Sequence, residues 1–405
     1  MRAAFFILSC SVSHYHSHIQ TALSLLETYK GKEPFAVFIK KFFAANKKYG
    51  SKDRKAIAHY CYCTFRWGKA WAGKATEEKL LAGVWLCSQQ TPGIINEMRP
   101  LWLEAATTMG IEPDTATIEQ KLEIIGQPAY DTIFPWTKDL SEGIDSRKFT
   151  ESFFIQPDLF LRTRPGKMNK VKHQLDTAGI FSTRINEDCL ALTNSSNLEK
   201  TISPDKDAVI QDLSSQQITR FFQQVPKKDM ANVWDACAAS GGKSILLFDY
   251  LPSIKLTVSD IRASVLKNLE MRFHAAGIKG FRSFVADLSN PGRAIPDDKY
   301  TFIIADVPCS GSGTWSRTPE QLCVFDEERL LEYATLQKKI ISRLIPALLP
   351  GGYFLYITCS VFRQENEAQV DFLLENYPVK CVKKETIIGY DKKADTMFAA
   401  LFTTS

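Results

Sequence analysis

Apolar residues recur at helical spacing through the first third of the chain. Between about residues 15 and 140 they fall three or four positions apart, as in residues 35–43 and 80–85, with no convincing alternation. At about residues 130–148 Pro, Asp, Ser and Gly become frequent, which is typical of a domain boundary. The pattern predicts an all-helical domain over residues 1–140.

The rest of the chain mixes short apolar runs with helical patterns. Residues 159–164 and 188–192 have the character of strands around a helix at 168–177, which predicts a small α+β insert over residues 141–205. Further strands and helices then alternate. The predicted strands are residues 232–236, 255–260, 283–287, 301–307 and 353–358, and the main helices are 263–276 and 326–349. This alternation predicts an α/β domain with a doubly wound parallel sheet over residues 206–405.

Two of the predicted strands end in a cysteine flanked by small polar residues. Cys309 follows Asp306-Val307-Pro308, and Cys359 follows Tyr356-Ile357-Thr358. In an open parallel sheet the carboxyl ends of the strands carry the ligand site and its reactive groups, so the two thiols can face one pocket. The alternative is that both are small buried apolar residues, since free cysteine is often core. The matching positions of the two cysteines favour a chemical role for at least one of them.

A loop rich in small residues follows the first strand of the α/β domain. It runs Asp235-Ala236-Cys237-Ala238-Ala239-Ser240-Gly241-Gly242-Lys243-Ser244, and its small side chains allow a tight turn and a close approach of the backbone to a ligand. A phosphate-binding P-loop is excluded because Cys237 stands where its first glycine is required. The chain also has no Gly-x-Gly-x-x-Gly fingerprint of a dinucleotide site.

Aspartates end the successive strands. Asp260 lies 25 residues after Asp235, where a carboxylate can accept both ribose hydroxyls of an adenosine-containing cofactor. Asp287 ends the third strand and Asp306 the fourth. A strand-end Asp can also be a simple helix cap, but four in order indicate a groove suited to a sulfonium and a base.

Cysteine usage indicates a reducing compartment. The ten cysteines show none of the paired spacings of a zinc site or a disulfide framework, so we expect a cytoplasmic protein without a metal. Cys61 and Cys63 are too close for a zinc knuckle and resemble helix core. Residues 1–14 superficially resemble a short secretion signal, but a start-site extension or a first helix fits better. No segment has the roughly 18 apolar residues of a membrane span.

The net charge is only +5, but the basic residues are clustered. One cluster is Lys40, Lys41, Lys47, Lys48, Lys52, Arg54 and Lys55, and the other is Arg162, Arg164, Lys167, Lys170 and Lys172. Such clusters suit a polyanion, because each neutralised phosphate releases counterions. Solvated helix faces remain an alternative for either cluster alone.

Taken together, these motifs resemble the RNA (cytosine-5) methyltransferase family called Fmu/Sun or RsmB-like. The resemblance covers about residues 205–405 and rests on the loop Asp235 to Lys243, on Asp306-Val307-Pro308-Cys309-Ser310 and on Tyr356-Ile357-Thr358-Cys359-Ser360. Gln364 to Glu367 and Asp395 to Ala400 resemble the family's closing segments. Two departures exist: Ser240 replaces the usual proline, and the segment after Cys309, through Arg317, is less usual.

The resemblance implies a Rossmann-like domain that uses S-adenosylmethionine, preceded by a NusB-like helical domain and an RNA-recognition-like insert. It implies Cys359 as the thiolate that attacks carbon 6 of cytosine and Cys309 as its assistant, although the residues alone do not rank the two. Asp306 then holds the base and Lys243 supplies a positive field. The cofactor would be held by Cys237, Ala238, Ala239, Ser240, Gly241, Gly242, Lys243, Asp260, Asp287 and Asp306.

The expected partner is RNA with a single-stranded or flipped-out cytosine, most simply small-subunit rRNA, bound by a monomer. Transfer RNA is the second choice. A catalytically silent ribosome-assembly factor and a DNA cytosine methyltransferase stay open. An amino-group methyltransferase fits less well because Pro308 is followed by cysteine.

Overall fold

The computed structural model describes residues 14–70, 75–126, 130–198, 200–290, 292, 295 and 297–405, so the prediction for residues 1–14 falls almost wholly outside it. The described residues form two compact units. The first contains the residues up to 135 with segments 153–155 and 318–324. The second contains residues 136–152, 156–317 and 325–405. The predicted division at residues 140 and 205 stays a prediction.

The first unit is helical throughout its described residues, which confirms the prediction for this region. Its helices are α1 (His14–Thr28), α2 (Phe35–Ala45), α3 (Ser51–Phe65), α4 (Thr76–Leu86), α5 (Gly93–Met98), α6 (Pro100–Thr108), α7 (Ile118–Ile124), α8 (Tyr130–Ile133) and α15 (Glu320–Val324). At Gly83 of α4 a Cβ atom would lie 2.4 Å from the carbonyl oxygen of Cys63 on α3. Only glycine allows so close an approach. Cys61 and Cys63 are buried in this core, as expected.

The second unit begins with the short helices η1 (Thr137–Asp139) and α9 (Ser146–Ser152), and the α+β insert follows. Its sheet has the order β2-β3-β1-β4, built from β1 (Leu159–Thr163), β2 (Ser182–Arg184), β3 (Cys189–Leu192) and β4 (Ala208–Ile210). Helix α10 (Met168–Thr177) packs Val171 and Leu175 against one face of this sheet. The strand, helix and strand expected here are all present, and the short strands β2 and β4 are additional.

A seven-stranded sheet forms the centre of the second unit. Its order is β10 (Val379–Ile387), β11 (Met397–Thr404), β9 (Leu348–Thr358), β8 (Tyr300–Asp306), β5 (Asn232–Asp235), β6 (Lys255–Asp260) and β7 (Arg282–Val285). The five strands from β9 to β7 are parallel, as predicted. The prediction of a wholly parallel sheet is wrong at one edge, because β11 runs antiparallel to both β9 and β10.

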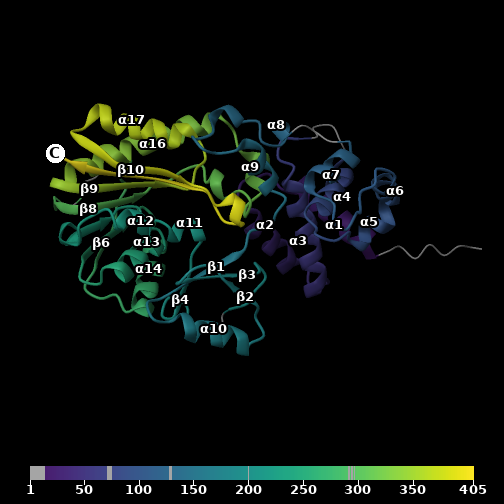
Figure 1. Ribbon diagram of the computed structural model, residues 1–405, viewed down its shortest axis with the longest axis horizontal. Helices are drawn as coiled ribbons and strands as arrows, with labels where there is room; N and C mark the ends of the chain where they lie inside the picture. The colour runs from purple at the N-terminus through teal and green to yellow at the C-terminus, as the bar shows by residue number, and fades with distance from the viewer. Residues whose placement is uncertain are drawn as a thin grey trace, which may run out of the picture. The chain divides into compact units, whose positions relative to one another are not determined.

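Helices cover both faces of this sheet. Along β5, Val233 joins one hydrophobic core and Trp234 the other, and Ile304 and Ile303 of β8 divide in the same way. Figure 1 shows the result: α12 (Thr219–Phe222), α13 (Gly242–Tyr250) and α14 (Ala263–Ala276) lie on one side, and α16 (Glu328–Leu344) and α17 (Glu367–Asn376) on the other. The sheet is therefore doubly wound. In the described part of the chain no helix is long and apolar enough to cross a membrane.

Candidate active site

The loop after β5 is shaped by its small residues. Ala239 has φ +45° and Gly241 φ +82°, and a Cβ on Gly241 would lie 2.6 Å from the ring of Phe273. The amide of Ala238 donates to the carbonyl of Ser259, which fixes the loop against β6. Glycine at 241 is thus required both by its backbone angle and by space, and α13 begins directly after it.

A pocket of about 560 Å³ lies at the carboxyl ends of the parallel strands. Its polar lining comes from the ends of β6, β7 and β8, and it also contains both thiols. The predicted residues that line it are Cys237, Ala239, Asp260, Asp287, Asp306, Cys309 and Cys359. Sequence reasoning missed Ile261, Arg262, Leu288, Ser289, Leu336 and Ile340. Four of these directly follow a strand-end Asp, which is the signal that could have found them.

Asp235 does not line this pocket, although we expected all four strand-end aspartates around one groove. It is fully buried, and the hydroxyl of Ser244 donates to its carboxylate at 2.6 Å. Burial raises the pKa of Asp235 to about 7. Its role is to anchor the start of α13 beneath the loop.

Asp260 accepts hydrogen bonds from the loop and from its own neighbour. The amide of Ala239 donates to it at 3.1 Å, and the amide and guanidinium of Arg262 donate at 2.9 to 3.2 Å. Burial alone would raise the pKa of Asp260, but the hydrogen bonds from Arg262 hold it below its ordinary value. The carboxylate is therefore ready to accept from hydroxyl groups in the pocket.

The two predicted thiols meet. The sulfur of Cys309 lies 3.3 Å from that of Cys359, although 50 residues separate them. The hydrogen bond with Cys359, together with burial, raises the pKa of the Cys309 thiol well above its usual value. Cys309 therefore stays protonated beside its partner.

Lys243 and Asp306 form an ion pair in the same place. The Lys243 ammonium donates to Asp306 at 2.7 Å, and only 12% of the lysine side chain is exposed. Burial opposes the charge of Lys243, but Asp306 and the nearby Cys359 raise its pKa. The cation thus persists next to Cys359.

Glu365 joins the two cysteine loops. It is fully buried, accepts from the backbone amide of Ser310 at 2.8 Å, and accepts from the hydroxyls of Ser310 and Ser360. Gln337 of α16 donates to the same carboxylate at 3.0 Å. Each serine directly follows one of the thiols, so a single carboxylate sets the spacing of the two loops. The sequence motif contained Glu365 but did not show this contact.

A second, smaller pocket of about 270 Å³ adjoins the first. It is lined by Asp212, Ser240, Gly242, Lys243 and Asp395 among others, and Asp306 and Cys359 line both pockets. The predicted loop residues Ala238 and Gly241 line neither pocket and shape the loop instead. The Asp306 and Cys359 side chains therefore form a wall shared by two cavities.

The less usual segment after Cys309 supports two residues that line the smaller pocket. The guanidinium of Arg317 bridges Asp212 and Asp395, at 2.7 Å from each carboxylate. Burial, and then repulsion by Asp212, raises the pKa of Asp395. Arg317 thus holds two acidic side chains together at the edge of the smaller pocket.

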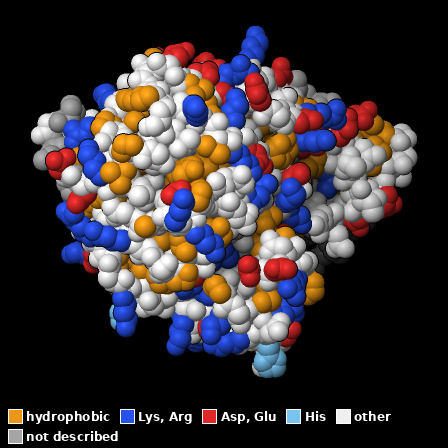
Figure 2. All heavy atoms as spheres, turned by 60° about the vertical axis from the view of Figure 1, so that its left-hand side comes forward, with side chains coloured by type: hydrophobic (Ala, Val, Ile, Leu, Met, Phe, Trp, Pro, Cys, Tyr) orange, Lys and Arg blue, Asp and Glu red, His pale blue; other side chains and the backbone are white. Residues whose placement is uncertain are grey.

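The second basic cluster does not form the expected surface strip. Arg162 and Arg164 are 5% and 8% exposed, and both donate to Asp249 of α13. The prediction of an exposed basic strip is wrong for these two arginines, because both are buried and pair with Asp249, which joins the insert to α13. Lys170 of α10 is exposed although it pairs with Asp207. Figure 2 shows Lys, Arg and His side chains gathered at the lower edge of the face that it displays.

The second unit thus contains a Rossmann-like domain whose candidate site lies at the carboxyl ends of its parallel strands. Residues 223–399 match the 16S rRNA methyltransferase RsmB/F family, which confirms the resemblance found in the motifs. The chain is 32% identical over 174 residues to ribosomal RNA small subunit methyltransferase B of Xylella fastidiosa strain 9a5c, and 30% identical over 170 residues to that of Xanthomonas campestris. These alignments cover 43% and 42% of this chain, but only 40% and 38% of the relatives.

Solved structures show the same fold. The crystal structure of PH0851 superposes with a TM-score of 0.67 at 17% identity and covers 95% of this chain and 98% of its own. NSun6 from Pyrococcus horikoshii, solved with SFG, gives a TM-score of 0.57 at 15% identity and covers 68% of this chain and 96% of its own.

Proposed function

We propose that this protein methylates carbon 5 of a cytosine in RNA, with small-subunit rRNA as its substrate. The observation that carries the proposal is the shared wall: Cys359 and Asp306 face both a 560 Å³ pocket and a 270 Å³ pocket, with Cys309 and Lys243 in contact with them. A larger cavity suits the cofactor and a smaller one suits a single flipped base.

The residues present fit S-adenosylmethionine. Asp260 offers carboxylate oxygens for a ribose, Asp287 lies further along the same pocket, and the left-handed Gly241 lets the backbone at Cys237 to Ala239 approach a ligand. The carboxylates of the pocket suit a sulfonium cation. When bound, S-adenosylmethionine supplies an electrophilic methyl group, and the protein supplies position and electrostatics.

The chemistry begins with sulfur. Carbon 5 of cytosine is a poor nucleophile, and addition of the Cys359 thiolate to carbon 6 forms a C–S bond that turns the ring into an enamine nucleophilic at carbon 5. The Lys243 ammonium lies beside Cys359, and a neighbouring cation is typical of a nucleophilic cysteine, whereas the hydrogen bond with Cys359 and burial raise the pKa of Cys309. This asymmetry supports Cys359 as the nucleophile, a choice that sequence alone left open.

Asp306 and Cys309 complete the reaction. Asp306 hydrogen-bonds the amino group and N3 of the base, for which either the carboxyl or the base carries a proton. Once carbon 5 carries its methyl group, its proton passes to water, and the electron pair of the C–H bond re-forms the ring double bond and breaks the C–S bond to release Cys359. The protonated Cys309 thiol lies close enough to Cys359 to donate a hydrogen bond to the departing sulfur and so assist its release.

The names of the relatives support the proposed substrate. Those of Xylella and Xanthomonas carry the name ribosomal RNA small subunit methyltransferase B, and SFG is an analogue of S-adenosylmethionine. A transfer RNA substrate is the alternative, and a silent assembly factor on the same fold is a further one. Both thiols, Lys243 and Asp306 are assembled, which argues against loss of chemistry.

The test uses total RNA from cells that lack the protein, incubated with tritiated S-adenosylmethionine and then fractionated. We expect label as 5-methylcytidine in small-subunit rRNA. Cys359→Ala should abolish it, whereas Cys381→Ala, a half-buried cysteine on β10 outside both pockets, should not. Full activity of the Cys359 variant would reject the mechanism, and label confined to transfer RNA would reject the substrate.

A further inference from the structure

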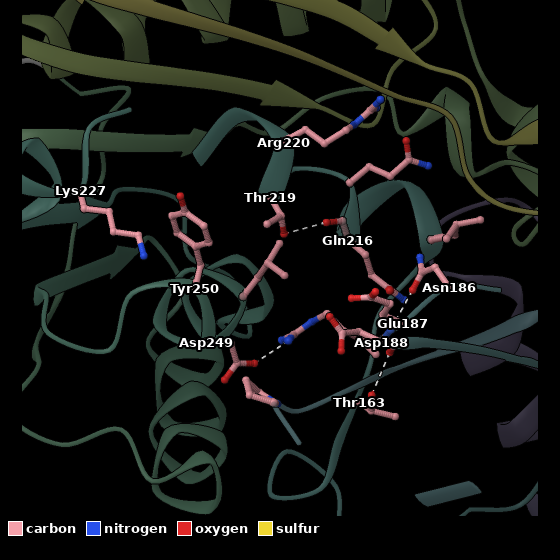
Figure 3. A pocket seen from close by; sticks show the side chains of 15 residues that line it. Thr163, Asn186, Glu187, Asp188, Gln216, Thr219, Arg220, Lys227, Asp249 and Tyr250 are labelled. Atoms are coloured by element: carbon pink, nitrogen blue, oxygen red, sulfur yellow. Dashed lines mark hydrogen bonds and ion pairs between the residues drawn. The ribbon is translucent and has the colours of Figure 1, made fainter. Parts of the chain in front are cut away.

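The second unit contains another pocket, of about 650 Å³, that the proposed reaction does not use (Figure 3). Its walls come from β1, from the turn between β2 and β3, from α11 (Leu213–Gln216) and α12, and from the end of α13. The pocket therefore lies where the insert meets the helices of the large sheet. Neither thiol and none of the strand-end aspartates of that sheet lines it.

A buried cation with an unused donor lines this pocket. The Nε of Arg162 donates to Gln211 at 2.7 Å and its Nη1 to Asp249 at 2.5 Å, but its Nη2 has no partner among the described residues. Arg162 is 5% exposed, so this N–H group is shielded from water. A buried guanidinium donor without a partner is costly and indicates a missing acceptor.

Three further side chains add to its chemistry. Lys227 is exposed at the rim, and its ammonium lies 5.3 Å from the ring centroid of Tyr250. On another side, Glu187 and Asp188 of the β2–β3 turn bring exposed carboxylates (Figure 3). Arg162 and Lys227 suit an anionic group, and the carboxylates suit hydroxyl or amino donors. A ribonucleotide carries an anionic group and such donors together: its phosphate suits the cations, and its 2′-hydroxyl or base amino group suits the carboxylates.

The pocket is a neighbour of the proposed base site. Asp212, which caps the N-terminus of α11, and Ser215 of that helix line the 270 Å³ pocket. Leu213 and Gln216 of the same helix line the 650 Å³ pocket. One short helix thus carries lining residues of both pockets. Gln211 also connects the two, because its amide accepts from Arg162 and donates to the carbonyl of Gly242 at 3.4 Å.

We propose that this pocket binds a ribonucleotide close to the target cytosine in the same RNA strand. The inference rests on the proposed function, since it takes RNA as the substrate. It gives the insert a defined role, in which β1 and the β2–β3 turn hold the strand while the target base enters the smaller pocket. Recognition of the modified site then depends on a second nucleotide as well as on the cytosine.

The test compares two adjacent lysines of the full-length protein. Lys227 lines the pocket, and Lys228 is equally exposed but does not. With small-subunit rRNA from cells lacking the protein, Lys227→Gln should raise the KM for RNA roughly five- to tenfold with kcat unchanged. It should also reduce the salt slope of RNA binding by about 0.7, the contribution of one phosphate contact in a single strand. Lys228→Gln should change neither value, and both variants should bind S-adenosylmethionine normally by calorimetry.

A second measurement locates the contact directly. RNA carrying 4-thiouridine is crosslinked to the unaltered protein and the peptides are identified by mass spectrometry. We expect crosslinks in the peptides that contain Asn186 to Asp188 or Tyr250. Equal effects of the two lysine variants, or crosslinks that avoid both peptides, would overturn the assignment while leaving RNA methylation intact. A protein that binds S-adenosylmethionine but neither binds nor methylates RNA would instead refute the proposed function itself.

Discussion

At the scale of single residues, the two thiols are in contact but not equivalent. The hydrogen bond with Cys359 and burial raise the pKa of Cys309, whereas the charge of Lys243 acts on Cys359. The raised pKa keeps the proton on the Cys309 thiol, while the Lys243 ammonium lies beside Cys359. The two cysteines, each of which follows a strand and precedes a serine, thus have different electrostatic surroundings.

This asymmetry predicts the behaviour of Cys309→Ala. Because Cys359 remains free to add to the base but release is impaired, the variant should accumulate a protein–RNA adduct that survives denaturing electrophoresis as a slow band. The double variant Cys309→Ala, Cys359→Ala is the control and should give none. If the adduct instead forms with Cys359→Ala, the two roles are reversed.

Glu365 leads to a second prediction at this scale. Glu365→Gln keeps the size of the side chain but replaces one acceptor oxygen with a donor, which disturbs the hydrogen bonds from Ser310 and Ser360. Misplacement of the thiols by a fraction of an ångström should lower kcat by about 10- to 100-fold, with little change in the KM for RNA.

The control for Glu365 is Glu367, a second buried glutamate two residues on, which accepts from Ser141 and not from the cysteine loops. Glu367→Gln should lower the melting temperature without a comparable loss of kcat. Rates of thiol alkylation should change for the Glu365 variant alone. Equal kinetic losses in the two variants would reduce Glu365 to a general structural residue.

At the scale of elements, the sequence located the strand ends more reliably than it assigned the side chains around them. The apolar runs before Asp260, Asp306 and Cys359 predicted β6, β8 and β9, because buried parallel strands are short and continuously apolar. The edge strand β10 escaped notice because charged residues alternate along it. Its pairing with β11 is a tertiary property that no local run displays.

Arg162 and Arg164 show a different limit. In the sequence they belong to a basic cluster, and only the fold reveals Asp249, more than 80 residues away, as their common partner. The same holds for Glu365, whose contacts join loops 50 residues apart. A charge cluster along a chain therefore does not by itself predict exposure, because a distant carboxylate can pair with some of its members inside the fold.

Asp235 gives a prediction about β5 and its loop. Because burial raises its pKa from 3.8 to about 7, the folded protein binds more protons than the unfolded chain between these values, and the free energy of unfolding falls as pH rises through this window. Asp235→Asn removes that slope. From pH 5 to pH 8, the free energy of unfolding of the variant should rise relative to that of the unaltered protein by a few kcal/mol, at about 1.4 kcal/mol per pKa unit.

Denaturant unfolding of the two proteins at a series of pH values measures this difference. The variant Asp287→Asn, at a partly exposed strand end, is the control and should not alter the slope. Parallel curves for the unaltered protein and Asp235→Asn would show that the carboxylate is already ionised in the folded state at pH 5.

At the scale of the whole molecule, the proposed chemistry lies in one unit and the larger basic surface in the other. Six lysines of the first cluster are exposed on or between α2 and α3: Lys40, Lys41, Lys47, Lys48, Lys52 and Lys55. Arg54 instead donates to the carbonyl of Tyr49 and lies against the ring of Phe43. These ammonium groups can neutralise several phosphates at once, which supplies affinity without sequence information.

Reversal of three of these charges tests whether the helical unit binds RNA. The triple variant Lys47→Glu, Lys48→Glu, Lys52→Glu should weaken RNA binding by at least tenfold near 0.1 M salt and flatten its salt dependence, because each lost phosphate contact removes released counterions. S-adenosylmethionine binding should be unchanged. The matched control is Lys279→Glu, Lys339→Glu, Lys380→Glu, which alters net charge equally at exposed positions of the second unit. If the two triple variants lose RNA affinity to the same extent, the helical unit contributes only bulk charge, and RNA recognition then belongs to the insert and its pocket.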